Sequence, residues 1–334
     1  MFAMLSGAWP RSSDHDLDVD AVVRDLVAAQ AQAGMGFVTD GHLRWADPAA
    51  ALLAAIEAAD TGPGGMLLRA WTATAAEASA VGLPAVQAMP GPYSLGRRES
   101  SGLVPVPAER EAREARTLNL AATLAGEIAA LAAAGCPVVI VEEPAAVEIG
   151  VDPAERALFA EAQRTLISAV EAFPDLHAML AITGGNADTA GPETIFAAPY
   201  RSYLFDLVAG PDNWRLVRAA PPDRGIVCAA MRVEAAGLED QAPLLVWAAR
   251  YAGSSGGRGL DRVGLANGTP LGSLDPALAR EALVTLGEAA GLAVMPLDRA
   301  VQAGLDPRTV GSRTAALGPA APRPPRSRRR RAIP

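Results

Sequence analysis

Residues 135–144, GCPVVIVEEP, contain the pattern that decides the fold. Gly135 stands where a helix should stop, and Val138–Glu142 is a short run rich in β-branched residues that Glu143-Pro144 follows directly. Helical periodicity extends over Ala108–Ala134 before this run and over Ala154–Ala172 after it. A short buried strand between two helices predicts a βα unit of an α/β protein.

The same alternation of short apolar runs and longer helical patterns recurs about eight times along the chain. Further helices are predicted over Val19–Ala33, Leu238–Tyr251 and Pro276–Ala290. The predicted strands are Ala3–Ser6, Gly36–Asp40, Ala85–Met89, Val138–Glu142, Ala178–Ile182, Tyr203–Asp206, Ile226–Ala230 and Arg262–Leu265. Eight parallel strands with intervening helices predict one α/β domain, a single (β/α)8 TIM barrel over residues 1–316, whose site lies at the carboxyl ends of the strands.

Local signals add detail to this prediction. Aspartate-proline pairs at residues 152–153 and 275–276 predict helix starts, and Gly34 and Gly291, like Gly135, predict helix stops. The apolar run Met66–Thr72 is surplus to the eight strands, and we interpret it as part of a hairpin or an insertion before the third strand.

The composition describes a globular chain with a net negative charge. Of the 334 residues 50% are hydrophobic and 20% are charged, and the formal net charge is −8, so a nucleic acid is a poor candidate partner. No stretch approaches 18 uninterrupted apolar residues and Met1–Pro10 lacks a signal-peptide pattern, which leads us to expect a cytoplasmic protein with no membrane partner. Cys136 and Cys228 are too few for a disulfide framework or a multi-thiolate zinc site.

The last 18 residues, 317–334, differ from the rest of the chain. They contain six arginines, several prolines and no acidic residue, so we expect a disordered tail outside the folded domain. Arg328–Arg331 would suit weak contacts with anionic partners, whereas the plainer interpretation is a solvated tail without a dedicated partner.

Polar side chains follow most of the predicted strands. They are Ser6 and Arg11 after the first strand, Asp40, His42, Arg44 and Asp47 after the second, Tyr93 and Ser94 after the third, Glu142 and Glu143 at the fourth, and Asp206 at the sixth. Because the carboxyl ends of parallel strands meet at one rim, we expect these side chains to share a mouth suited to a small zwitterionic or polyacidic ligand. Individually, Asp40 would also suit a helix cap, Glu143 an exposed loop and His42 a structural hydrogen bond.

At these clusters the chain resembles the cobalamin-independent methionine synthase family, within the barrel superfamily that includes uroporphyrinogen decarboxylase. The resemblance extends from Leu5 to about Gly291 and matches the single catalytic barrel of that family. The segments that carry it are Ser6–Arg11, Gln30–Gly34 leading to Thr39–His42, Met89–Ser94 and Ala134–Pro144. The resemblance implies methyl transfer, in methionine biosynthesis, from a methylfolate or another donor such as methylcobalamin to a thiol that zinc holds as the thiolate.

The zinc ligands of that family are largely replaced in this sequence. The family binds zinc through a His-x-Cys pair after the fifth strand, a Glu after the sixth and a Cys after the eighth, and Ala181, Thr183, Asp206 and Thr269 occupy those positions here. Only Asp206 is a good zinc ligand, so we predict that the inherited site does not hold zinc. A replacement site for a harder divalent ion, built from His42, Asp40, Glu142 and Asp206, is an alternative.

Three functions remain open on the sequence. The first is a divergent methyltransferase in which His42 and Glu142, with Asp40, act as acid-base residues, and the substrate contacts come from the other strand-end side chains, Ser6, Arg11, Arg44, Asp47, Tyr93, Ser94 and Glu143. The second is a metal-free decarboxylase or lyase that uses Arg11, Arg44 and Asp40. The third is a non-catalytic barrel that binds a small molecule.

Overall fold

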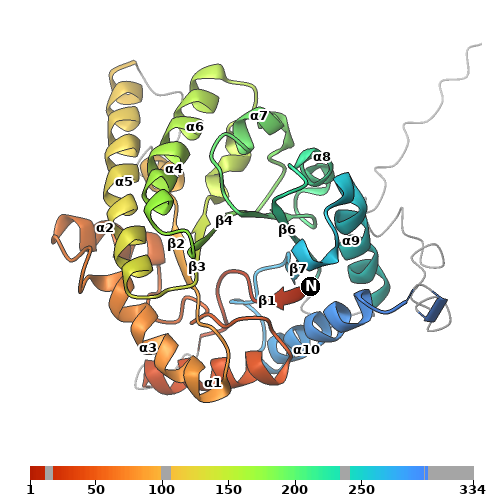
Figure 1. Ribbon diagram of the computed structural model, residues 1–334. Helices are drawn as coiled ribbons and strands as arrows, with labels where there is room; N and C mark the ends of the chain where they lie inside the picture. The colour runs from red at the N-terminus through yellow and green to blue at the C-terminus, as the bar shows by residue number, and fades with distance from the viewer. Residues whose placement is uncertain (12–17, 99–106, 234–240, 297, 300–334) are drawn as a thin grey trace, which may run out of the picture.

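The computed structural model of the chain describes residues 1–11, 18–98, 107–233, 241–296 and 298–299 (Figure 1). The expected tail at 317–334 lies outside the described residues. None of the described helices is long and apolar enough to cross a lipid bilayer.

The centre of the fold is one curled parallel sheet. Its strand order is β1-β7-β6-β5-β4-β3-β2, and every pairing between neighbours is parallel. The strands are β1 (Phe2–Met4), β2 (Gln87–Pro90), β3 (Val138–Glu142), β4 (His177–Ile182), β5 (Ser202–Asp206), β6 (Gly225–Met231) and β7 (Val263–Asn267). This is the arrangement of a TIM-barrel-like fold.

The predicted strand Gly36–Asp40 is the one departure from the expected eight. It makes a single parallel bridge, Val38 with Ala85, although its backbone also hydrogen-bonds to β1 through Gly36 N and Ala3 O. At Thr39 the backbone N–H and C=O bond instead to the buried amide side chain of Gln30, at 3.1 and 2.8 Å. A side chain has taken the place of a neighbouring strand, so the ladder stops, and the sheet that the described residues form has seven strands rather than eight.

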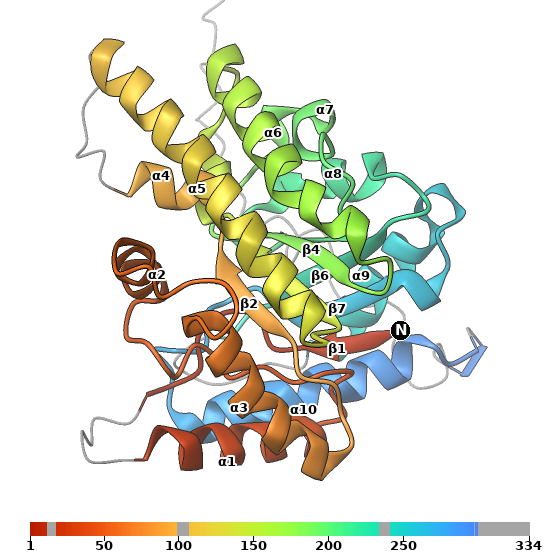
Figure 2. The same ribbon diagram turned by 60° about the vertical axis from the view of Figure 1, so that its left-hand side comes forward.

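Helices surround the sheet (Figures 1 and 2). They are α1 (Val19–Gln32), α2 (Pro48–Glu57), α3 (Met66–Val81), α4 (Pro92–Arg97), α5 (Pro107–Ala133), α6 (Pro153–Ser168), α7 (Pro192–Ile195), α8 (Trp214–Ala219), α9 (Ala242–Ser254) and α10 (Pro276–Ala293). Short 3₁₀ turns lie at η1 (Pro144–Glu148), η2 (Ala169–Ala172), η3 (Asp188–Ala190), η4 (Pro211–Asn213), η5 (Ser255–Gly257) and η6 (Leu260–Arg262). Both views place α4 against α5, which follows it in the chain.

Most of the predicted helix boundaries are confirmed and two interpretations are wrong. Asp152 and Asp275 cap α6 and α10 by accepting from the backbone two residues on, and Gly34 and Gly135 follow helices with positive φ. Gly291, by contrast, lies inside α10. The surplus run Met66–Thr72 is not a hairpin but the start of α3, because its buried residues recur at helical spacing: Leu67, Ala70, Thr74 and Ala78.

Alternation along the strands divides the core into two parts. One cluster fills the inside of the curled sheet and includes Met4, Ile140, Met179, Leu204 and Val227. A larger cluster lies between the sheet and the helices. Since side chains alternate between the two faces of a strand, the inner residues fix which strand-end side chains point into the mouth.

Candidate functional site

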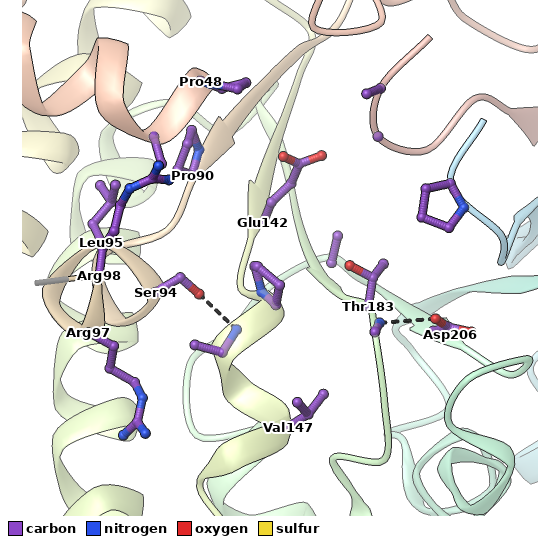
Figure 3. Close-up of a pocket in the computed structure, with 18 of the residues that line it drawn as sticks. Pro48, Pro90, Ser94, Leu95, Arg97, Arg98, Glu142, Val147, Thr183 and Asp206 are labelled. Atoms are coloured by element: carbon purple, nitrogen blue, oxygen red, sulfur yellow. Dashed lines mark hydrogen bonds between the residues drawn. The ribbon is translucent and has the colours of Figure 1, made fainter. Parts of the chain in front are cut away.

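A pocket of about 1500 Å³ opens at the carboxyl ends of the strands. It brings together ten of the side chains that the sequence singled out: Ser6, Arg11, His42, Asp47, Ser94, Glu142, Ala181, Thr183, Asp206 and Thr269. Figure 3 shows Glu142 pointing into the space between α4 and the ends of β4 and β5, with Thr183 and Asp206 on the far side. The convergence of segments from Ser6 to Thr269 is therefore confirmed by the structure.

Strand alternation explains why Glu142 faces this pocket and Glu143 does not. Glu142 lies two residues after Ile140 and therefore on the same face of β3, which is the inside of the curled sheet. Asp206 likewise lies two residues after Leu204, on the inside face of β5. Glu143 points the other way, toward α4 and α6, and is fully buried. Glu142 keeps 23% of its side chain exposed to the pocket.

The centre of the pocket is a buried pair between His42 and Glu142. The Nε2 atom of His42 lies 3.0 Å from Oε1 of Glu142, and the histidine is 8% exposed. Burial alone would lower the pKa of this imidazole, but the charge and hydrogen bond of Glu142, with a smaller effect from Asp40, raise the pKa of His42 to about 9. At neutral pH the imidazole of His42 is therefore protonated and positively charged.

A tight turn aims His42 at Glu142. Gly41 and His42 both have positive φ, 58° and 56°, a conformation that is uncommon for a residue other than glycine. The side chain of Asp40 stabilises the turn because its Oδ1 accepts from the backbone N–H of His42 at 3.0 Å. A Cβ at Gly41 would lie 2.7 Å from side-chain atoms of Trp9 and Leu26, so the close packing also requires glycine there.

Replacing His42 by asparagine tests the raised pKa, since asparagine tolerates positive φ and does not titrate. His42 gains proton affinity on folding, so its contribution to stability is complete below its unfolded pKa of 6.5 and is lost as the pH rises through about 9. We expect the unfolding free energy of the protein minus that of H42N to fall by up to about 3 kcal/mol across this window. Urea unfolding at several pH values measures it, and a constant difference would contradict the pairing.

Asp40 and Arg44 lie behind His42 rather than in the large pocket. The Oδ2 atom of Asp40 is 3.6 Å from Nε of Arg44, and Arg44 also binds Asp20 through Nη1 at 2.7 Å. Asp40 adjoins a separate cavity of about 10 Å³ under the His42–Glu142 pair. The structure thus gives Asp40 a positioning role toward His42, and Arg44 does not line the pocket.

Arg11 and Asp47 line the pocket but are already bonded to protein groups. Arg11 donates through Nη2 to the backbone carbonyls of His42, at 2.5 Å, and Trp45. Asp47 caps α2 by accepting from Ala49 and Ala50, and it pairs with Arg98.

Glu143, Tyr93 and Ser94 form a hydrogen-bonded joint between β3 and α4. Glu143 accepts from the backbone N–H groups of Tyr93 and Ser94, the Ser94 hydroxyl and the Gln163 amide. Burial raises the pKa of Glu143, and these four donors act in the opposite direction. The Tyr93 hydroxyl donates to Glu155 at 2.6 Å. Of the three residues only Ser94 lines the pocket, so the other two support its wall from behind.

The four positions at which the resemblance predicts zinc ligands do not fit a zinc ion. Ala181 has no donor atom, and the Thr269 hydroxyl accepts from Val233 N at 3.1 Å. Asp206 is 1% exposed, and its two oxygens accept from the backbone N–H groups of Val208, Ala209 and Gly184 at 2.8, 2.9 and 3.0 Å. The carboxylate is thus occupied by the turns after β4 and β5 (Figure 3). Among the described residues no cluster of three or more His, Cys, Asp or Glu could hold a metal ion.

Neither cysteine takes part in this site. Cys136 and Cys228 are buried outside the pocket, and burial raises the pKa of each thiol to about 12. Burial therefore disfavours the thiolate, which is the reactive form of a cysteine.

Sequence reasoning missed one wall of the pocket. Arg97 and Arg98 at the end of α4 and Arg113 of α5 line it together with Glu148 and Glu155. Arg97 pairs with Glu148 and Glu155, at 2.6 and 3.1 Å, and Arg113 pairs with Glu155. The signal available in the sequence was the Arg97-Arg98 pair directly beyond the third strand-end loop. Asn267 was missed too, and its amide joins Ser6 to β7 through two bonds of 2.9 Å.

Comparison with known proteins finds likeness in structure but none in sequence. No family model matches the chain, and no curated protein matches it. A putative vitamin-B12-independent methionine synthase from Listeria monocytogenes superposes with a TM-score of 0.64 at 16% identity, covering 87% of this chain and 97% of that one. A B12-independent methionine synthase from a Shewanella species, in complex with selenomethionine, gives 0.65 at 13% identity, covering 90% and 98%.

A methyltransferase from Methanosarcina mazei gives a TM-score of 0.56 at 14% identity and covers 87% of this chain and 93% of that one. Identities this low show a shared fold and leave the chemistry to the residues of the pocket. The chain therefore has the TIM-barrel-like fold found in these methionine synthase-like proteins and this methyltransferase.

Proposed function

We propose that the chain is a methyltransferase that acts on a small molecule in the carboxyl-end pocket and uses the His42–Glu142 pair instead of zinc. The observation that carries the proposal is this pair, an imidazolium and a partly exposed carboxylate 3.0 Å apart in a 1500 Å³ pocket. A titratable group in a large pocket whose pKa is shifted, as that of His42 is, is typical of active sites. The fold shared with one putative and one further B12-independent methionine synthase and with a methyltransferase supports the reaction class.

In the proposed chemistry one proton leaves the acceptor and one proton is delivered to the leaving group. Transfer of a methyl group from a donor X–CH₃ to an acceptor Nu–H forms the Nu–C bond, breaks the C–X bond and yields Nu–CH₃ and X–H. Glu142, which is exposed to the pocket, takes the proton of the acceptor as it attacks. His42, protonated at neutral pH, supplies a proton to the leaving group. A proton then passes from Glu142 to His42 along their hydrogen bond, and this transfer returns both residues to their starting charges.

The size of the pocket supports two ligands at once. Pockets for single small molecules have volumes of about 300–1,000 Å³, and this one is larger. The first pairs to test combine a methylfolate or methylcobalamin as donor with a thiol as acceptor. General acid-base catalysis supplies about 10²- to 10⁴-fold, so we expect an acceptor that is itself a good nucleophile.

The experiment incubates the protein with each donor and with homocysteine or another small thiol, and detects methylated product by mass spectrometry. We expect product from at least one pair, with a chelator present throughout. Failure of all pairs under these conditions would overturn the assignment to a methyltransferase that works without zinc.

Metal content gives a separate prediction. The replaced ligand positions and the occupied Asp206 carboxylate lead us to expect far less than one zinc per chain in protein purified from zinc-supplemented cells. Elemental analysis of the protein and of D206N should give the same low value. Stoichiometric zinc that D206N loses would mean that Asp206 is a ligand.

A ligand-binding barrel without catalysis is the second candidate, favoured by the loss of metal-binding side chains at Ala181, Thr183 and Thr269. A thermal-shift screen distinguishes it, because a ligand that stabilises the protein and is never converted indicates binding alone. The decarboxylase alternative loses support, since Arg11 and Arg44 are both bonded to protein groups.

A further inference from the structure

A second hollow lies at the opposite end of the sheet from the candidate active site. Its volume is about 390 Å³, and it opens where β4, β5, β6 and β7 begin. We call it the amino-end pocket, and its polar lining consists of His177, Arg201, Ser202, Asp223, Arg224, Asp261 and Arg262. Because β6 is seven residues long, about 20 Å of sheet separates the two pockets.

Three arginines line the amino-end pocket, and each of them lies at the start of a strand. Arg201, Arg224 and Arg262 each stand directly before the first residue of a strand, β5, β6 and β7. Those strands are neighbours in the sheet, with Ser202 paired to Gly225 and Ile226 paired to Val263. This register places Arg201 opposite Arg224 and Arg262 opposite Gly225, one residue further along, and all three arginines line the same pocket.

Much of the hydrogen-bonding capacity of these arginines is unused within the described residues. Arg224 pairs with Asp223 at 3.3 Å, and Arg201 donates through Nη2 to the carbonyl of Pro174. Arg262 is exposed, and its side chain has neither a hydrogen bond nor an ion pair with the described residues. Three guanidinium groups against Asp223 and Asp261 leave the rim with a net positive charge in a chain whose total is −8.

The remaining lining adds neutral donors and an apolar floor. His177 Nε2 lies 2.7 Å from the Ser202 hydroxyl, and burial, together with the charge of Arg201, lowers the pKa of His177 to about 4, so the imidazole is neutral at physiological pH. The ring of Phe2 closes the pocket toward the barrel interior. The ring fits there because residue 264 is glycine. A Cβ atom at this position would lie 2.5 Å from the ring.

We propose that the amino-end pocket binds a small ligand that carries a phosphate group, with its organic part against Phe2. Planar guanidinium groups bind the oxygens of a phosphate in pairs, and three arginines that line one pocket match a doubly charged anion better than a single carboxylate. The volume lies within the usual range for small-molecule sites, about 300–1,000 Å³. The site is separate from the proposed active site, so the two assignments succeed or fail independently.

The test titrates the full chain with inorganic phosphate and with glycerol phosphate at constant ionic strength, and uses sodium chloride and acetate as controls. We expect saturable thermal stabilisation by both phosphates and by neither control. Glycerol phosphate binding more tightly than inorganic phosphate would assign the site to phosphate esters, and equal affinity would assign it to the free anion. The absence of saturation at millimolar concentrations of both phosphates would overturn the proposal.

Matched variants locate the binding. R262Q and R224Q each remove one guanidinium group, and we expect affinity for phosphate to fall at least about tenfold in each. R280Q removes an exposed arginine of α10 and should bind as the unchanged protein does. Equal loss in all three would indicate a general charge effect and contradict the site.

A histidine signal provides a readout independent of stability. The chain has three histidines, so comparison with H177Q assigns the ring resonances of His177. Phosphate binding should shift those resonances and raise the pKa of His177, because it brings negative charge next to Arg201. Unchanged His177 resonances at saturating phosphate would place the anion elsewhere.

Discussion

D206A is expected to unfold at a markedly lower denaturant concentration than the unchanged protein. Alanine leaves three backbone N–H groups, those of Gly184, Val208 and Ala209, without their acceptor. Each buried donor left unpaired costs about 1–3 kcal/mol. Since the residue borders the pocket, water can reach part of the gap, and we expect a total loss of about 3–5 kcal/mol.

Two controls make this result specific to Asp206. D206N keeps an oxygen for two of the three donors, so its loss should be about 1–2 kcal/mol. D275A removes a carboxylate that caps α10 through one bond to Ala277, and its loss should be about 1 kcal/mol. Urea denaturation measures all three, and a D206A loss no larger than that of D275A would show that the carboxylate does not hold these turns.

E142Q is expected to lose about 10²- to 10⁴-fold in rate for the proposed methyl transfer. Glutamine keeps the shape of the side chain but accepts no proton, and it leaves the imidazolium of His42 without its counterion. The pKa of His42 should then fall from about 9, because Glu142 supplies the largest effects that raise it. The pH dependence of the residual rate and the titration of His42 measure the two consequences separately.

A surface carboxylate in an ion pair is the matched control for E142Q. Glu77 pairs with Arg24 at 3.0 Å, outside the pocket, so E77Q should turn over at the unchanged rate. If E142Q kept full activity while the unchanged protein was active, the reaction would not depend on this pair. A loss of rate without any change in the titration of His42 would mean that Glu142 acts without its partner.

Much of the candidate site followed from local patterns in the sequence. The run 138–142 has the length and composition of a buried strand, and alternation along it sends Ile140 and Glu142 to one face and Glu143 to the other. Because Ile140 lies on the inner face, alternation predicts that Glu143, three residues later, points away from the pocket. The same rule applied to Met66–Thr72 fails, because there the buried positions are three and four residues apart.

Other features depended on partners far away in the chain. The local pattern of Gly36–Asp40 predicts a strand, but the buried amide of Gln30 forms hydrogen bonds with the backbone N–H and C=O of Thr39. The sequence predicts that Asp206 is a remaining metal ligand, but its carboxylate accepts hydrogen bonds from the backbone N–H groups of Gly184 and Val208. Neither outcome is visible in a local pattern, since any nearby donor or acceptor satisfies a buried polar group equally well.

The sequence alone therefore determined the parallel βα architecture, the gathering of the candidate site residues at the carboxyl end of the sheet, and the absence of zinc-binding side chains at three positions. Tertiary structure decided that His42 meets Glu142 across 100 residues, and that Arg11, Asp47, Glu143 and Asp206 are bonded to protein groups. The reason is physical. Periodicity and turn residues act over a few neighbouring positions, whereas the partner of a buried polar group is set by which distant segments pack beside it.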